Sequence, residues 1–162
     1  MGSESEIPAS ASADAETRDR IAQYEMAAFV ARELITELGA ERGMGIIGRA
    51  LDAMMTRQGT QLATRLGSNE FAAFAAHLKT WAARDDTWQV LTDEPDQLAI
   101  RITRCPNFEA FVALGLQEVG RRYYEADWAY AAGFNPRLRL TRPQSIAEGD
   151  EVMIDVWTMD TA

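Results

Sequence analysis

The fold of this chain is decided by residues 87–104, which read TWQVLTDEPDQLAIRITR. Two runs within it, Thr87 to Thr92 and Leu98 to Arg104, alternate in polarity and are rich in branched and aromatic residues. Such alternation is typical of half-buried strands. The segment between them, Asp93 to Asp96, supplies turn residues. We therefore predict a β-hairpin whose second strand turns its leucine and isoleucine side chains to one face and Arg101 to the other.

A second hairpin is predicted nearer the C-terminus. Its strands are Arg137 to Arg142 and Glu151 to Thr158, joined through Ala147 to Asp150. Between the hairpins, a helical stretch opens at Pro106 with Asn107 as its expected N-cap. Gly115 and Gly120 weaken this stretch, which favours two helices meeting at a bend.

Helical spacing also precedes the first hairpin. Three segments carry apolar residues at helical spacing, the first of them at alternating steps of three and four, which is the pattern of one buried helix face. They run from Ile21 to Leu38, from Met44 to Leu66 and from Phe71 to Trp81. Gly39 follows the first, where a left-handed cap is expected, and Gly67 is expected to end the second. Ser68 or Asn69 is the expected N-cap of the third.

The order of elements predicts an α+β fold, with N-terminal helices packed on an antiparallel sheet of two hairpins separated by a helix. No strand–helix–strand alternation is present, which argues against a parallel sheet. Residues 1–16 are small, polar and acidic and are expected to form a disordered tail. Residues 17–162 are expected to form a single domain, because chains of this size rarely divide.

Composition excludes several functions. The formal net charge of −9 argues against nucleic-acid binding. With only Cys105 and His77 as thiol and imidazole, neither a cysteine zinc site nor a multi-histidine metal site is expected. No phosphate loop or dinucleotide fingerprint appears, so we expect no cofactor. The sequence shows neither a membrane-spanning run nor a signal peptide, which predicts a cytoplasmic protein.

Polar residues crowd the helix between the hairpins. Asp127 follows Tyr124 by three residues beside an apolar stripe, so the two side chains could converge. A buried carboxyl beside a phenol can act as an acid–base pair, and it can equally be a structural hydrogen bond. Glu118 and Arg122 are four residues apart, as are Arg121 and Glu125, so both pairs have the spacing of surface ion pairs.

Cys105 lies at an element boundary next to Arg104. A cysteine nucleophile needs a base or a cation to form thiolate, and Arg104 is expected to leave the strand on the opposite face. The alternative is a buried, inert cysteine.

Several short motifs of the C-terminal half occur in a characteristic order. They are Ile102-Thr103-Arg104-Cys105-Pro106, Leu114-Gly115, Tyr124-Glu125-Ala126-Asp127, Gly133-Phe134-Asn135-Pro136, Leu138-Arg139-Leu140-Thr141-Arg142 and Gly149-Asp150. Together they resemble the family of L-2-amino-thiazoline-4-carboxylic acid hydrolases, most closely over Leu98 to Trp157.

The resemblance implies an enzyme that opens a cyclic, amidine-like ring bearing a carboxylate, in specialised metabolism. Under this hypothesis Asp127 is the general acid–base, assisted by Tyr124 and with Cys105 as a further catalytic candidate. The substrate-binding candidates are Arg104, Arg142, Glu118, Trp128 and Trp157. Either arginine could hold the substrate carboxylate bidentately.

This chain departs from the family pattern at two positions. Tyr124 and Met153 stand where members commonly carry cysteines. The alternative hypothesis is therefore a non-catalytic protein that binds a small ligand on the same fold. The faces of the leading helices also suggest a homodimer.

Overall fold

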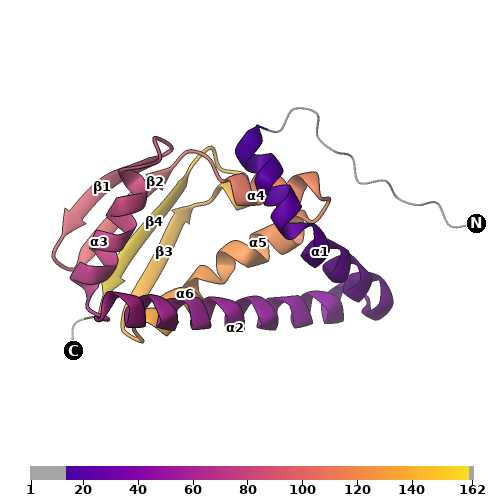
Figure 1. Cartoon of the computed structure of the whole chain (residues 1–162), viewed down its shortest axis with the longest axis horizontal. Coiled ribbons are helices and arrows are strands. Elements are labelled where there is room, and N and C mark those ends of the chain that lie inside the picture. The colour runs from indigo at the N-terminus through magenta and orange to yellow at the C-terminus, as the bar shows by residue number, and fades with distance from the viewer. Residues whose placement is uncertain (1–13, 161–162) are drawn as a thin grey trace, which may run out of the picture. The chain divides into compact units, whose positions relative to one another are not determined.

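The computed structural model describes residues 14–160, and its elements confirm the predicted α+β fold (Figure 1). The helices are α1 (Ala15–Leu38), α2 (Ala40–Leu66), α3 (Phe71–Ala82), α4 (Pro106–Ala113), α5 (Gln117–Glu125) and α6 (Asp127–Phe134). The strands are β1 (Trp88–Glu94), β2 (Gln97–Ile102), β3 (Leu138–Gln144) and β4 (Met153–Met159), with a 3₁₀ turn η1 (Ile146–Glu148) before β4.

The chain folds into two compact units. Residues 14–48 and 105–123 form the first, which we call the helical unit. Residues 49–104 and 124–160 form the second, the sheet unit. The predicted tail lies mostly outside the described residues, although Ala15 and Glu16 already belong to α1.

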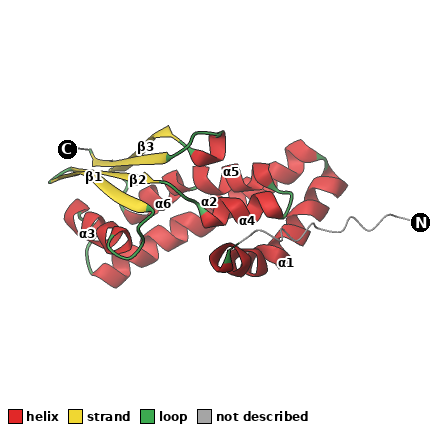
Figure 2. Ribbon diagram, turned by 90° about the horizontal axis from the view of Figure 1, so that it is seen from above, coloured by secondary structure: helices red, strands yellow, loops and turns green. Residues whose placement is uncertain are grey.

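The sheet unit carries one four-stranded antiparallel sheet in the order β1-β2-β4-β3. The two predicted hairpins join where β2 pairs with β4. Figure 2 shows α3, α6 and the adjoining part of α2 on one side of this sheet. The side chains of Leu98, Ile100 and Ile102 are buried while Arg101 is exposed, which confirms the predicted faces of β2.

A close helix crossing fixes α6 against α2 within the sheet unit. A Cβ atom on Gly133 would lie 2.2 Å from the carbonyl oxygen of Thr56, and one on Gly59 would lie 2.1 Å from that of Tyr130. The Thr60 hydroxyl also donates to the Gly133 carbonyl at 3.1 Å. Only glycine permits this approach, because any side chain would overlap a backbone atom.

In the helical unit, α1 packs along α4. The Thr17 hydroxyl donates to Glu109 Oε2 at 2.6 Å. The Tyr24 hydroxyl donates to Asn107 Oδ1 at 3.0 Å, and its ring stacks on Phe111 with centroids 4.9 Å apart.

Two predicted helix N-caps were wrong. Helix α4 begins at Pro106, directly after Cys105, because proline needs no hydrogen-bond partner for its nitrogen in a first turn. Asn107 therefore lies inside the helix. Helix α3 is preceded by Glu70, and the Ser68 hydroxyl accepts from the Glu70 amide instead of capping the helix.

The stretch between the hairpins forms three helices rather than the two predicted. Gly115, with φ +70°, separates α4 from α5. A further break at Ala126 separates α5 from α6, so Asp127 begins a new helix. Between residues 14 and 160, no helix is both long and apolar enough to cross a membrane.

Candidate functional site

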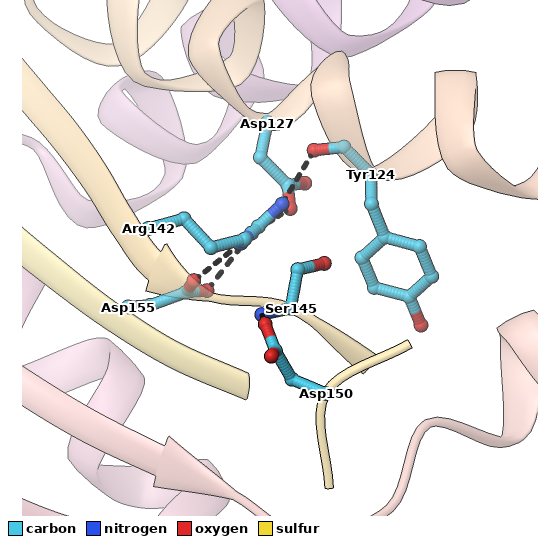
Figure 3. A network of polar contacts seen from close by, with 6 residues as sticks. All are labelled: Tyr124, Asp127, Arg142, Ser145, Asp150 and Asp155. Atoms are coloured by element: carbon cyan, nitrogen blue, oxygen red, sulfur yellow. Dashed lines mark hydrogen bonds and ion pairs between the residues drawn. The ribbon is translucent and has the colours of Figure 1, made fainter. Parts of the chain in front are cut away.

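A charged cluster lies within the sheet unit, at the start of α6 (Figure 3). It consists of Asp127, Arg142 and Asp155, and we call it the arginine–carboxylate cluster. Arg142 donates to both oxygens of Asp155, from Nε at 2.6 Å and from Nη2 at 3.0 Å. Its Nη2 also donates to Asp127 Oδ2 at 2.7 Å, and its Nη1 donates to the Tyr124 carbonyl at 2.8 Å.

Strand alternation brings Arg142 and Asp155 together. Arg142 follows two buried leucines at steps of two along β3, and Asp155 precedes the buried Trp157 by two along β4. Residues two apart share a face of a strand, so both charges point into the apolar side of the sheet. The pairing register of β3 shifts between Thr141 and Gln144, which places Arg142 in a bulge. Bulges of this kind re-aim a side chain next to functional sites.

Asp127 reaches the cluster from the first turn of α6. Its side chain is 20% exposed, against 4% for the Arg142 side chain and 8% for that of Asp155. Burial raises the pKa of Asp127 to about 6, against the opposing charge and hydrogen bond of Arg142 and with a further upward contribution from Asp155. Asp127 therefore exchanges a proton close to neutral pH.

Arg142 stays protonated throughout. Burial alone would lower its pKa, but hydrogen bonds and charge from Asp155, together with the charge of Asp127, outweigh burial and raise that pKa. The cluster therefore holds one permanent positive charge against two carboxyl groups.

Aromatic rings border the guanidinium of Arg142. Its Cζ atom lies 5.2 Å from the Trp128 ring centroid and 5.8 Å from that of Tyr124. Trp128 is 44% exposed. Trp157, which was predicted to wall the same site, is buried and packs on Phe74 with centroids 4.9 Å apart, so it belongs to the core.

Tyr124 is joined to the cluster through its backbone and ring. Figure 3 shows its carbonyl accepting from Arg142 while its hydroxyl points away from Asp127. The expected convergence of the Tyr124 hydroxyl with the Asp127 carboxyl group does not occur.

The loop before β4 is closed by Asp150. Its Oδ2 accepts from the Ser145 amide at 2.7 Å, and its own amide donates to the Ser145 carbonyl at 3.1 Å. Gly149, with φ +103°, provides the left-handed turn that precedes Asp150. The Gly-Asp motif thus shapes the segment that joins β3 to β4.

Two other predicted residues lie in the helical unit. Cys105 is buried immediately before α4. Glu118 forms an ion pair with Arg121 on α5. Arg104 belongs to the sheet unit and follows the end of β2. The substrate-binding and catalytic roles of these three residues stay predictions. Across residues 14–160, no group of three or more His, Cys, Asp or Glu side chains is placed to hold a metal ion.

Sequence reasoning missed Asp155. A signal was available, since Asp155 alternates with Met153 and Trp157 in the strand MIDVWTM, so it occupies an inward position. An acidic residue at such a position predicts a buried partner, because an unpaired buried charge is costly.

This chain belongs to the family of L-2-amino-thiazoline-4-carboxylic acid hydrolase, whose model matches residues 19–152. The match confirms the predicted resemblance. It suggests a hydrolase of a thiazoline amino-acid derivative, and hence a small-molecule substrate. A search of curated protein sequences found none that matches this chain.

Proposed function

We propose that this protein is a hydrolase of a carboxylate-bearing heterocycle or amino-acid derivative, and that it opens a C–N bond of the cyclic amidine type in specialised metabolism. The observation that supports this proposal is the carboxyl group of Asp127, which is held on Arg142 with a pKa of about 6 in a member of this hydrolase family. A catalytic acid–base works best when its pKa lies near the operating pH.

In the proposed reaction, the ionised Asp127 accepts a proton from the water molecule that attacks the amidine carbon. The carboxyl group then returns this proton to the ring nitrogen of the adduct. As the C–N bond breaks, the remaining hydroxyl proton passes to the released amine and the hydroxyl becomes the carbonyl. One water molecule is consumed and Asp127 ends in its starting state. Arg142 holds the carboxyl group in place through the hydrogen bond to Oδ2.

Other predicted residues take supporting roles in this proposal. Trp128, which is partly exposed beside the cluster, forms a wall of the substrate site. Tyr124 contributes its ring and its carbonyl, which fixes Arg142. Arg104 remains the proposed partner of the substrate carboxylate. The substrate-binding role of Glu118 and the catalytic role of Cys105 stay predictions from the sequence.

The proposal is tested by turnover of L-2-amino-thiazoline-4-carboxylate and related ring analogues. Asp127→Asn should fold normally and lose activity by about 100-fold or more, since general acid–base catalysis contributes at least this much. Asp93→Asn is the matched control, because Asp93 pairs with Lys79 on the surface of the same unit. Turnover in the wild type should rise as pH increases through about 6, the pKa of Asp127. Full activity of Asp127→Asn would remove this mechanism.

The second candidate is a binding or regulatory protein without turnover. It is favoured by Tyr124 and Met153, both buried, at the positions where the family pattern has cysteines. A ring analogue that raises the melting temperature without being consumed at any pH would favour this alternative.

A further inference from the structure

We infer that the arginine–carboxylate cluster receives the cationic, N–H-bearing end of the substrate, so that Asp127 binds an amidinium-like group and Arg142 does not bind the substrate carboxylate. This inference rests on the proposed function and assigns an orientation to the substrate. It depends on hydrogen-bond occupancy, charge and exposure within the sheet unit.

The guanidinium of Arg142 is nearly fully occupied. It has five N–H groups, and four hydrogen bonds already run to Asp155, Asp127 and the Tyr124 carbonyl. One N–H on Nη1 is left over, whereas a bidentate carboxylate needs two parallel donors. The side chain is also only 4% exposed. Arg142 therefore lacks both the donors and the access to clamp a substrate carboxylate.

The charge of the cluster is negative once Asp127 ionises. Asp155 uses both oxygens on Arg142 and neutralises it as a buried pair. The carboxylate of Asp127 is then in surplus, which gives the three groups a net charge of −1. Such a cluster attracts a cation and repels a second carboxylate.

Asp127 also has the accessible acceptor. It is the most exposed member of the cluster, at 20%. Its Oδ2 accepts from Arg142, while no residue among 14–160 donates to its Oδ1. An N–H group of a ligand can therefore form a charge-assisted hydrogen bond to Oδ1 without displacing a protein contact.

Trp128 adds a surface suited to a planar cation. It follows Asp127 directly on α6, and the residue is 44% exposed beside the cluster. A planar cation gains attraction over an indole face, and since Arg142 already lies over one face of this ring, the ligand would use the other face. An amidinium group combines the charge, the N–H donors and the planar shape that these neighbours favour.

The test uses simple probes and the full chain. Acetamidinium and acetate are titrated separately at constant ionic strength, and the indole N–H signals are followed by proton–nitrogen NMR. Acetamidinium should move the signal of Trp128 and leave that of the buried Trp157 in place, whereas acetate should move neither. The affinity of the Asp127→Asn variant for acetamidinium should be lower by about tenfold or more, which is the loss expected for a charge-assisted hydrogen bond. Asp93→Asn should bind like the wild type.

A wild-type comparison does not depend on the folding of any variant. Lowering the pH from 7.5 to 5 protonates Asp127 and should weaken acetamidinium binding by about tenfold, given its pKa of about 6. Arg142 and Asp155 are the charged groups that contact or face Asp127 from β3 and β4, and Arg142 keeps its charge over this range.

Binding of acetate in preference to acetamidinium would overturn the inference, as would equal acetamidinium affinity in Asp127→Asn. If Asp127→Asn loses turnover but binds the probe normally, the inference fails and the proposed hydrolase stands. If the probe binds through Asp127 but no thiazoline carboxylate is hydrolysed, the hydrolase proposal fails and the inference stands.

Discussion

Each of the two units joins its elements through polar side chains, but in different ways. In the helical unit, Thr17 and Tyr24 on α1 donate single hydroxyl hydrogen bonds to Glu109 and Asn107 on α4. In the sheet unit, Arg142 brings a full charge into the protein interior and is shared by two carboxyl groups.

The hydroxyl hydrogen bonds of the helical unit stabilise the fold, whereas the buried charges of the sheet unit cost free energy of desolvation. A hydroxyl hydrogen bond contributes about 0.5–1.5 kcal/mol to the free energy of unfolding, so its removal has a small effect. A buried ion pair often stabilises a protein no more than an apolar pair of the same volume does. Removing one partner is nevertheless strongly destabilising, because the other charge stays buried without a partner. A cluster that also contains a surplus carboxyl is more costly still. We therefore propose the arginine–carboxylate cluster as the functional region of the molecule.

Removal of Arg142 should give the largest effect. Arg142→Met leaves Asp155 buried without its positive partner, so the free energy of unfolding should fall by about 3–5 kcal/mol at pH 7.5 in urea denaturation. Arg139→Met is the control on the same strand, because Arg139 pairs with Asp160 at the surface, where both side chains are 50% exposed. The control should lose less than about 1 kcal/mol. Equal losses in the two variants would show that the buried cluster is no different from a surface pair.

Substitution of Gly133, where α6 contacts α2, should have the second largest effect. Gly133→Ala puts a Cβ atom 2.2 Å from the Thr56 carbonyl oxygen, so it should destabilise the protein by about 3 kcal/mol. It should also weaken binding of acetamidinium, because α6 carries Asp127. Ala132→Ser, at the exposed neighbouring position, should change neither quantity measurably. A Gly133→Ala variant with wild-type stability would contradict the close crossing of α2 and α6.

The pH dependence of stability should isolate Asp127. Its pKa is raised from 3.8 to about 6 in the folded protein, so the folded state binds the proton more tightly than the unfolded state does. The contribution of Asp127 to stability is therefore largest at low pH and is lost as pH rises through about 6. Between pH 4 and 7.5, the wild type should lose about 2 kcal/mol relative to Asp127→Asn. A difference that stays constant, or grows with pH, would contradict the raised pKa.

The hydroxyl contacts of the helical unit should give the smallest effect. Tyr24→Phe keeps the ring that stacks on Phe111 and removes only the hydrogen bond to Asn107. Stability should fall by about 1 kcal/mol in urea denaturation, with unchanged turnover and probe binding. A loss as large as that of Arg142→Met would erase the contrast between the two units.

Local pattern was enough to predict most of the fold. The hairpins follow from alternation, and the ends of α1 and α2 were predicted at Gly39 and Gly67. The left-handed cap expected at Gly39 was wrong, because its φ of 80° is combined with a ψ of 158°. The strand order was not predictable in this way, because the pairing of β2 with β4 joins residues far apart in the sequence.

The candidate site was predictable only in part. Asp127 and Arg142 were identified as candidates, but their contact depends on the placement of α6 against β3, which periodicity does not specify. Asp155 could have been found from its inward position in β4. That Arg142 binds protein carboxylates could be predicted only after Asp155 was identified as its partner. One buried arginine has too few N–H donors to bind a substrate carboxylate and two protein carboxylates together.

The most direct test is a carbon-13 NMR titration of the Asp127 carboxyl group, assigned by the signal that disappears in Asp127→Asn. A midpoint near pH 6 is expected, because burial outweighs the attraction of Arg142 and Asp155 already neutralises that arginine. A midpoint at or below 3.8, the ordinary value for aspartic acid, would contradict it. Asp127 would then be an ordinary ion-pair partner of Arg142, and its assignment as the proton carrier of the proposed hydrolase would fall.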